Sequence, residues 1–218
     1  MHIGVLGTGT VGRTLSQALV DRGHEVRMGS RAAGNEKAVA WAEQAGPLAS
    51  EGSFADAAAF GEFVVNATAG AASLAVLQAA GAEQLAGKVL VDVSNPLDTS
   101  KGMPPTLTVC NDDSLGEQIQ RAFPEVRVVK TLNTVTAAVM VDPGLVPGSH
   151  AIFVCGDDAA AKQQTSILLT EFGWPEGRVL DLGDITAARG TEMYLALWLR
   201  LWAATGTATL NVQVLTSS

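Results

Sequence analysis

The sequence of 218 residues contains little cysteine and few basic residues. Its two cysteines, Cys110 and Cys155, are too few for a disulfide framework and lack the spacing of metal ligands, so we expect no metal site. Lysine and arginine total 14 against 22 acidic residues, which gives a net charge of −8. That charge argues against nucleic acid or an anionic membrane surface as the main partner, because both would repel the chain.

The sequence also lacks a hydrophobic run long enough to span a bilayer. Its most apolar segment, Met193 to Ala204, is too short and contains Arg200. The first residues do not form a basic and then apolar leader of the secretory kind, so we expect a cytoplasmic protein without a membrane partner. Hydrophobic residues make up 47% and charged residues 17% of the chain, which is typical of a domain that folds around its own core.

A strand, a tight turn and a helix are predicted at the start of the chain, where an apolar stretch from His2 to Leu6 runs into a Gly-x-Gly-x-x-Gly motif. The motif residues are Gly7, Thr8, Gly9, Thr10, Val11 and Gly12. The first glycine permits the turn, the second lets a pyrophosphate approach the backbone, and the third lets the helix pack close to the strand. Because free amide groups at the helix N-terminus can bind phosphates, the pattern indicates a dinucleotide site rather than a tight turn alone.

The end of the second predicted strand, Glu25 to Met28, indicates which dinucleotide binds. Sites for NAD carry an acidic residue about 20 positions after the glycine turn, where it binds the ribose hydroxyls. Here the position holds Ser30 and Arg31, and Lys37 follows a few residues later. These side chains can donate hydrogen bonds and positive charge to a 2′-phosphate, so we predict NADP rather than NAD as the cofactor.

Strands and helices alternate up to residue 172, which predicts an α/β fold with a doubly wound, mainly parallel sheet. Further strands are expected at 62–66, 88–93, 126–129 and 151–155, and helices at 37–49, 53–60, 114–123 and 158–172. Ligands of such sheets lie at the carboxyl ends of the strands. The predicted loops at those ends contain Thr68, Ala69, Asn95 and Asn133, and we expect all four to border the cofactor.

The C-terminal part contains a last predicted strand at 178–182 and a helix at about 186–204. From Met193 onward this helix is apolar on nearly every face, with Trp198 and Trp202 one turn apart. A chain this short can bury such a helix against the same helix of a second subunit, so we predict a homodimer.

These predictions divide the chain into two segments. Residues 1–182 are predicted to form an NADP-binding domain. Residues 183–218 are predicted to supply a helical dimerisation segment, part of the acceptor pocket, and an exposed edge strand at 210–214, where apolar and polar residues alternate.

Several stretches of the chain match one known family. They are Gly7–Gly12, Gly29–Arg31, Asn95–Leu97, Lys130–Thr134, Cys155–Asp158 and Gly183–Arg189 followed by Glu192. Together they resemble the NADPH-dependent oxidoreductases of the coenzyme F420 (8-hydroxy-5-deazaflavin) type, whose fold flavin-linked reductases also use. The resemblance covers essentially the full length. It implies a Rossmann domain, hydride transfer between NADPH and a flat acceptor, and dimerisation through the C-terminal helix.

The resemblance also implies roles for individual residues. Thr8 to Val11 would hold the pyrophosphate, and Ser30, Arg31 and Lys37 would hold the 2′-phosphate. The stretch from Asn133 to Ala137, which includes Thr134 and Val135, would border the nicotinamide and the stacked acceptor ring.

The acceptor pocket is expected between Asn133–Val135 and the helix that carries Arg189. Arg189 matches an arginine that helps to hold the deazaflavin, and it would be the main fixed charge of the pocket. The polar positions just beyond it in the family are Met193 and Leu195 here, which cannot donate the same hydrogen bonds. The acceptor is therefore left open between coenzyme F420 and a flavin, FMN or FAD.

Hydride transfer between stacked rings requires no obligatory acid, base or metal from the protein. A second interpretation is a dehydrogenase or imine reductase, in which Lys130 and Asn133 polarise a C=O or C=N bond and burial lowers the pKa of the lysine. The structural alternative for Lys130 is a strand-end lysine that reaches solvent or a helix C-terminus. A third interpretation is a sensor that binds NADP without turnover.

Overall fold

The computed structural model describes residues 1–217, and its centre is an eight-stranded sheet of order β10-β9-β8-β5-β4-β1-β2-β3. Residue 218, the last of the predicted C-terminal segment, lies outside the described range. The strands are β1 (His2–Leu6), β2 (Glu25–Ser30), β3 (Ala49–Ser53), β4 (Phe63–Asn66), β5 (Val89–Asp92), β8 (Arg127–Thr131), β9 (Ile152–Cys155) and β10 (Val179–Asp181). Only the β8–β9 pair of this sheet is antiparallel, so the predicted doubly wound, mainly parallel sheet is confirmed.

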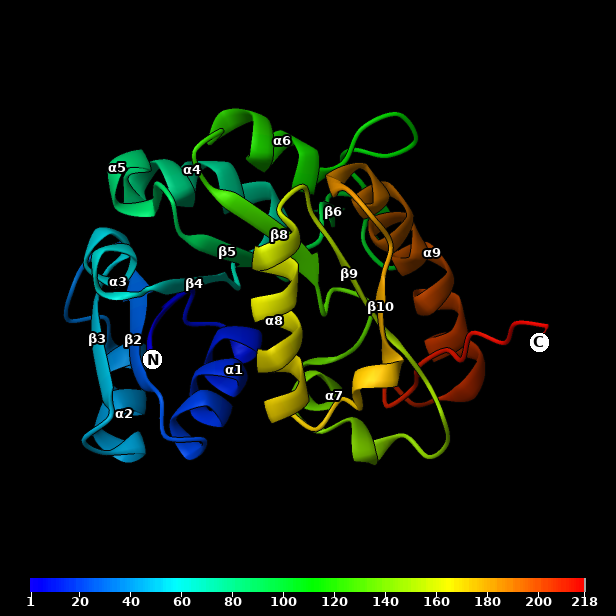
Figure 1. Ribbon diagram of the computed structural model, residues 1–218, viewed down its shortest axis with the longest axis horizontal. Helices are drawn as coiled ribbons and strands as arrows, with labels where there is room; N and C mark the ends of the chain where they lie inside the picture. The colour runs from blue at the N-terminus through cyan, green and yellow to red at the C-terminus, as the bar shows by residue number, and fades with distance from the viewer. Residues whose placement is uncertain (218) are drawn as a thin grey trace.

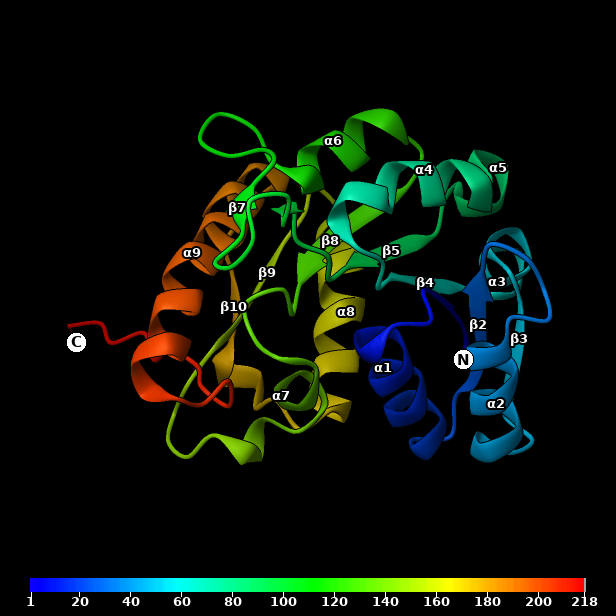
Figure 2. The ribbon, with the colours of Figure 1, turned by 180° about the vertical axis from the view of Figure 1, so that it is seen from behind.

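Helices cover both faces of the sheet (Figures 1 and 2). They are α1 (Thr10–Asp21), α2 (Glu36–Ala45), α3 (Phe54–Phe60), α4 (Gly70–Ala80), α5 (Ala82–Leu85), α6 (Leu115–Ala122), α7 (Ala137–Val141), α8 (Ala159–Glu171) and α9 (Ala188–Thr205). In Figure 1, α4, α5 and α6 lie above the sheet, α1, α2 and α7 lie below it, and α9 lies at the right.

Each face of the sheet has its own hydrophobic core. One core packs α1, α2, α7 and α8 against the sheet, with Trp41 and Trp174 among its largest members. The other packs α3 to α6 and the start of α9 against the opposite face, around Leu90 and Ile119. The strands between two cores must be apolar on both sides, which is why β4 and β5 read as short, nearly continuous apolar runs rather than alternating ones.

The strand order reverses direction beside β1, because β2 lies on one side of it and β4 on the other. In doubly wound sheets this switch point opens a crevice at the carboxyl ends of the strands, where ligands bind. The loops that follow β1, β4, β5 and β8 all emerge at that edge, since these four strands run parallel.

Between residues 37 and 53 the structure corrects the predicted elements. The predicted helix at 37–49 is the shorter α2, which the Asn35 side chain caps and which ends before Gly46, a residue with φ of 92°. Residues 49–53 then form β3, which pairs in parallel with β2 at the sheet edge. The sequence Ala-Ser-Glu-Gly-Ser has few strand-forming residues, so local propensity gave no sign of this strand.

The predicted edge strand at 210–214 is wrong, because these residues have no strand geometry. These residues are nevertheless hydrogen-bonded to Ala151, the residue just before β9. The amide of Ala151 donates to the carbonyl of Val212 at 3.1 Å, and the Asn211 side chain donates to the carbonyl of Ala151 at 2.8 Å. A separate two-stranded antiparallel pair, β6 (Leu97–Asp98) and β7 (Thr106–Leu107), lies in the long segment between β5 and α6.

Within residues 1–217, no helix combines the length and apolar character that a membrane crossing requires.

A Gly4→Ala variant tests how closely α3 packs on the central strand. A Cβ at Gly4 would lie 2.2 Å from the carbonyl oxygen of Ala57, a backbone atom that cannot move alone. We expect the substitution to lower the free energy of unfolding by roughly 1–3 kcal/mol, measured by urea denaturation. Gly190→Ala, where a Cβ meets no atom within 4 Å, is the control and should not lower stability. Equal stability of the two variants would contradict the close approach.

Candidate functional site

A cavity of about 560 Å³ lies at the carboxyl edge of the sheet. The loops after β1, β4, β5 and β8 form most of its wall, and α9 closes one side. Among the predicted site residues, those that line it are Thr10, Val11, Thr68, Ala69, Asn95, Asn133, Thr134, Val135 and Ala137. The structure therefore brings residues from four separate loops of the sequence to one place.

Other lining residues were not assigned to the site from the sequence. They are Val93, Ser94, Leu97, Ala138, Met140 and Trp198. Most follow directly from the predicted loops and could have been found by extending each loop by one or two residues. Trp198 could not, because its place in the wall depends on how α9 packs against the sheet. The wall also contains Thr136 and Leu195, which the sequence analysis places in the nicotinamide stretch and in the acceptor pocket, and Ala67 and Gly70, which flank Thr68 and Ala69 in the same predicted loop.

Two long helices point uncapped N-termini toward this cavity. α1 and α4 begin at Thr10 and Gly70, both of which line the cavity, and neither helix has a side-chain cap or an acidic residue in its first turn. Side chains cap α2, α3, α6 and α8, whereas α5, α7 and α9 also lack a side-chain cap, and of these three only α7 begins at a residue of the cavity wall. Free amide groups and the positive end of the helix dipole favour an anion, so the electrostatics suit the pyrophosphate of a dinucleotide.

The glycine motif fits that ligand in its local geometry. A Cβ at Gly12 would lie 2.0 Å from the carbonyl oxygen of Gly7, and one at Gly7 would lie 2.7 Å from that of Ala67. These two glycines let α1 and the loop after β4 pack against the turn. Gly9 has no atom within 4 Å of its would-be Cβ, so the backbone there is open to an approaching phosphate.

A buried network of polar side chains supports the loops on the β4 and β5 side. Asp92, at the end of β5, accepts hydrogen bonds from Asn66 at 2.8 Å and from the Ser94 hydroxyl at 2.7 Å. Asn66 also donates to Ser73 in α4 at 3.0 Å and accepts from the Thr68 hydroxyl at 2.6 Å. The loop after β4, the start of α4 and the loop after β5 therefore hold one another in position.

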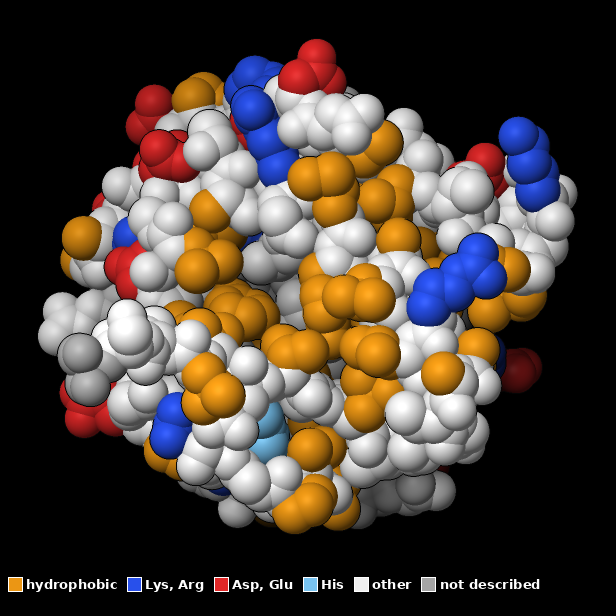
Figure 3. Space-filling view, turned by 90° about the vertical axis from the view of Figure 1, so that its right-hand side faces the viewer, with side chains coloured by type: hydrophobic (Ala, Val, Ile, Leu, Met, Phe, Trp, Pro, Cys, Tyr) orange, Lys and Arg blue, Asp and Glu red, His pale blue; other side chains and the backbone are white. Residues whose placement is uncertain are grey.

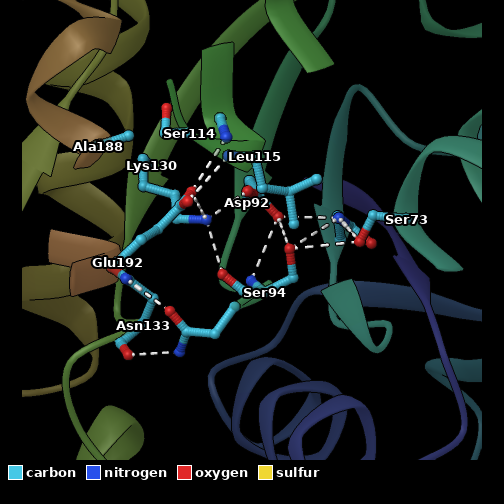
Figure 4. Close-up of polar contacts among 12 residues, drawn as sticks. Ser73, Asp92, Ser94, Ser114, Leu115, Lys130, Asn133, Ala188 and Glu192 are labelled. Carbon is cyan, nitrogen blue, oxygen red and sulfur yellow. Dashed lines mark hydrogen bonds and ion pairs between the residues drawn. The ribbon is translucent and has the colours of Figure 1, made fainter. Parts of the chain in front are cut away.

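Lys130, in β8, is fully buried and forms two ion pairs (Figure 4). Its ammonium group lies 2.8 Å from Asp92 Oδ2 and 2.8 Å from Glu192 Oε1 in α9, and it donates to the carbonyl of Ser94 at 2.6 Å. Burial alone would lower the pKa of Lys130, but the two carboxylates raise it above its ordinary value. The expected strand-end lysine that reaches solvent or a helix C-terminus is therefore wrong.

Glu192 has further partners that explain how a second carboxylate is tolerated in this interior. Its two oxygens accept hydrogen bonds from the amides of Leu115 and Gly116, at 2.8 and 3.0 Å, in the first turn of α6. The helix dipole of α6 and Lys130 thus stabilise the same negative charge. Through Glu192, α9 is attached to both β8 and α6.

Asn95 and Asn133 join the loops after β5 and β8 at the cavity wall. The Asn95 side chain donates to the carbonyl of Asn133 at 2.8 Å, and the Asn133 side chain donates back to Asn95 Oδ1 at 3.0 Å. The preceding Leu132 has φ of 61°, a left-handed conformation that a branched side chain rarely adopts. Such strain is typical of functional loops that the surrounding structure holds in place.

Two buried polar atoms in the cavity wall have no hydrogen-bond partner among the described residues. They are the Thr134 hydroxyl, in the loop after β8, and the indole N–H of Trp198, in α9. Unpartnered buried polar groups are rare and costly, so each calls for an explanation. A polar ligand in the cavity, such as the carboxamide of a nicotinamide, would supply the missing partners.

The predicted 2′-phosphate residues Ser30, Arg31 and Lys37 do not line the cavity. Ser30 is buried, and its hydroxyl donates to the carbonyl of Ala32 at 2.6 Å, so the hydroxyl proton is already used. Arg31 and Lys37 are exposed. The sequence analysis missed Arg13 of α1, which lines a groove of about 360 Å³ together with Lys37.

Arg189 does not line the cavity, which corrects its predicted role as the main fixed charge of the pocket. Its guanidinium forms a bidentate ion pair with Glu117 of α6, with Nε and Nη2 at 2.8 and 2.5 Å from the carboxylate. The Ser114 hydroxyl donates a hydrogen bond to Glu117 and fixes this carboxylate at the start of α6, where it binds Arg189. The predicted pocket residue Met193 is also absent from the cavity wall, since its side chain faces outward, whereas Leu195 lies in the wall.

The described part of the chain contains no group of three or more His, Cys, Asp or Glu residues that could hold a metal ion.

Comparisons with known proteins identify relatives of this chain. Residues 2–96 match the family model described as NADP oxidoreductase coenzyme F420-dependent. A crystal structure of a candidate F420-dependent NADP-reductase from Arthrobacter sp. FB24 is 56% identical, has a TM-score of 0.93, and covers 99% of this chain and 100% of its own.

Two curated relatives are longer than this chain. Metalloreductase STEAP3 of Rattus norvegicus is 32% identical over 202 residues, which are 91% of this chain and 36% of the relative. The F420-dependent NADP reductase of Methanocaldococcus jannaschii is 32% identical over 120 residues, 55% of this chain and 52% of the relative. The match therefore spans about a third and about half of these two proteins.

A Lys130→Met variant tests the buried ion pairs. Removal of the ammonium group leaves two buried carboxylates unpaired, and we expect unfolding free energy to fall by about 3–5 kcal/mol, measured by urea denaturation. Unpaired carboxylates would have raised pKa values in the folded state, so the folded variant binds more protons than the unfolded one. Its stability should therefore rise as the pH is lowered from about 8 to about 5.

The surface pair of Lys162 and Asp181 supplies the control for this experiment. Lys162→Met should cost less than about 1 kcal/mol, because its partner Asp181 is half exposed and solvent screens the pair. A Lys130→Met variant as stable as Lys162→Met, with no gain at lower pH, would refute the role of the buried lysine.

Proposed function

We propose that this chain, which belongs to the family of coenzyme F420-dependent NADP oxidoreductases, binds NADP(H) and exchanges a hydride with a flat acceptor, a deazaflavin or a flavin. The observation that carries the proposal is the cavity at the carboxyl edge of the sheet, whose wall combines uncapped helix N-termini with unpartnered polar groups. That combination suits a ligand with an anionic middle and a polar, flat end.

Different residues would bind different parts of the cofactor. The turn from Thr8 to Val11 and the start of α4 would bind the pyrophosphate through backbone amides. Arg31 and Lys37 would bind the 2′-phosphate, and Arg13 adds a third cation near Lys37. Asn133 and Thr134, both in the cavity wall, would orient the nicotinamide.

Bound NADPH would supply the hydride, and solvent would supply the accompanying proton to the acceptor. The chain itself would bind, orient and exclude water, because transfer between stacked rings depends mainly on their alignment. Val135, Leu195 and Trp198 form an apolar part of the wall over the expected nicotinamide position. An apolar wall there would limit the access of water to the rings.

The dehydrogenase or imine reductase alternative finds less support. It needs a lysine of lowered pKa near the substrate, whereas Lys130 does not line the cavity and its pKa is raised. Asn133 does line the cavity and stays a predicted polarising group in that alternative. A sensor that binds NADP without turnover remains the other alternative, which the activity experiment below separates. The cytoplasmic location stays a prediction.

We also propose that the chain forms a homodimer through α9. The structure corrects one detail of that prediction, because Trp198 and Leu195 are buried within their own subunit. The side chains that remain for a partner are Met193, Leu197 and Trp202, which are 36%, 55% and 39% exposed. Figure 3 shows a band of hydrophobic side chains across the face of the molecule on which α9 lies. A contiguous exposed apolar patch of this kind marks a protein interface.

Oxidation of NADPH, followed by the loss of absorbance at about 340 nm, tests the proposed function. We expect turnover with oxidised coenzyme F420 or with FMN, and little with small carbonyl compounds. Arg31→Ala should weaken NADPH binding about ten- to a hundredfold and leave NADH binding nearly unchanged, because only NADPH carries the 2′-phosphate. Arg121→Ala, which removes an arginine paired with Asp113, is the control and should change neither. NADPH binding without turnover on any acceptor would favour the sensor.

Trp202→Glu tests the dimer. A charge placed in the apolar patch should convert the dimer to a monomer, measured by light scattering at micromolar concentration. Leu145→Glu replaces a similarly exposed apolar residue, 47% exposed and outside α9, and should leave the dimer intact. A monomeric unmodified protein would contradict the proposal.

A further inference from the structure

Trp198 carries the polar side-chain atom that α9 brings to the wall of the cavity at the carboxyl edge of the sheet. The helix contributes two of the described lining residues, Leu195 and Trp198, and the side chain of Leu195 is purely apolar. Trp198 is 8% exposed, and its indole N–H has no hydrogen-bond partner within residues 1–217. Because an indole nitrogen can donate but not accept, this group requires an acceptor.

Thr134 supplies the complementary group from the loop after β8. It is 2% exposed, and its hydroxyl also has no partner in the described part of the chain. The neighbouring Asn133 differs, because its side-chain amide already donates to Asn95. A hydroxyl can accept as well as donate, so the wall offers one group that must donate and a second group that can accept.

The elements that carry these two groups are held in place by contacts within the protein. Glu192 attaches α9 to Lys130 of β8 and to the first turn of α6, which fixes the helix that carries Trp198 (Figure 4). The reciprocal hydrogen bonds of Asn95 and Asn133 fix the loop that carries Thr134. A ligand therefore meets a pre-organised wall, which lowers the entropic cost of binding.

We propose that Trp198 and Thr134 together recognise the carboxamide of the nicotinamide ring. Trp198 donates to the carboxamide oxygen, and the Thr134 hydroxyl accepts from the NH₂ group. The inference rests on the proposed function, which assigns the nicotinamide to this cavity. A primary amide fits the pair because it carries one acceptor and one donor on the same carbon. Val135, Met140 and Leu195 make the surrounding wall apolar, and a hydrogen bond is stronger where water is excluded.

Contacts at the carboxamide also control which face of the nicotinamide meets the acceptor. A half-turn of the ring about its glycosidic bond exchanges the two faces and moves the carboxamide to the opposite side. Hydrogen bonds from Trp198 and Thr134 hold the carboxamide on one side, so a single face stays open for hydride transfer. The two residues thus determine orientation and specificity, and neither supplies a proton to the reaction.

Three nucleotide probes test these contacts without turnover, by isothermal titration calorimetry of the full chain in the absence of an acceptor. NADP⁺ carries the whole carboxamide. Its 3-acetylpyridine analogue keeps the carbonyl oxygen but lacks the NH₂ group, and 2′,5′-ADP lacks the nicotinamide half. We expect the unmodified chain to bind NADP⁺ about three- to tenfold more tightly than the analogue, which is the range for one neutral hydrogen bond.

Two variants assign the two contacts separately. Trp198→Phe should weaken NADP⁺ and the analogue alike, about three- to tenfold, because both carry the carbonyl oxygen. Thr134→Val should weaken NADP⁺ by a similar factor and leave the analogue unchanged, so the preference between them disappears. Binding of 2′,5′-ADP should stay unchanged in both variants. Trp202→Phe is the matched control, because Trp202 lies one turn further along α9 and outside the cavity wall, and it should alter none of the three affinities.

The outcomes separate this inference from the proposed function. Weaker binding of 2′,5′-ADP by Trp198→Phe would indicate a general loosening of the site and overturn the inference. Unchanged NADP⁺ affinity in Trp198→Phe, or a Thr134→Val variant that still prefers NADP⁺ to the analogue, would also overturn it. In these cases the unmodified chain still binds NADP⁺ and the proposed function stands, whereas an unmodified chain that fails to bind NADP⁺ overturns both.

Discussion

The ion pairs of Lys130 with Asp92 and Glu192 join the sheet to the C-terminal helix at the point where both form the cavity wall. Three charged groups in an interior would be costly if any were left alone, so the arrangement is stable only when β5, β8 and α9 are all in place. Glu192 lies one turn before Leu195 and two turns before Trp198, and both of those side chains line the cavity. The buried charges therefore fix the rotation of α9 and, with it, which side chains face the ligand.

The distribution of helix caps explains how a chain of net charge −8 can present a site for an anionic cofactor. Side chains satisfy the N-termini of α2 and α8, which lie away from the cavity, whereas those of α1 and α4 are left free where they meet it. The attraction is thus supplied by backbone dipoles at short range rather than by net charge. The same principle operates inside the protein, where the amides at the start of α6 stabilise Glu192.

The sequence predicted the fold class and most of the cavity loops, because both depend on local patterns. Short apolar runs bounded by turns locate strands, and the ends of parallel strands must meet at one edge, so Thr68, Asn95 and Asn133 could be placed together. The partners of Lys130 and Arg189 could not be predicted. Each pairs with a carboxylate more than 35 residues away, Asp92 or Glu117, and no local signal states which distant carboxylate a lysine or arginine will meet.

The apolar character of α9 has more than one cause, which the sequence alone could not separate. The sequence of the helix is apolar on nearly every face because its residues lie in three different environments. Ala188 at its start packs in the core beneath α6, Leu195 and Trp198 form cavity wall, and Leu197 and Trp202 are exposed. Only the last group requires a partner from outside the subunit. A substitution in α9 therefore tests assembly only when it leaves the cavity wall intact, and tests the cavity only when it leaves the outer face intact.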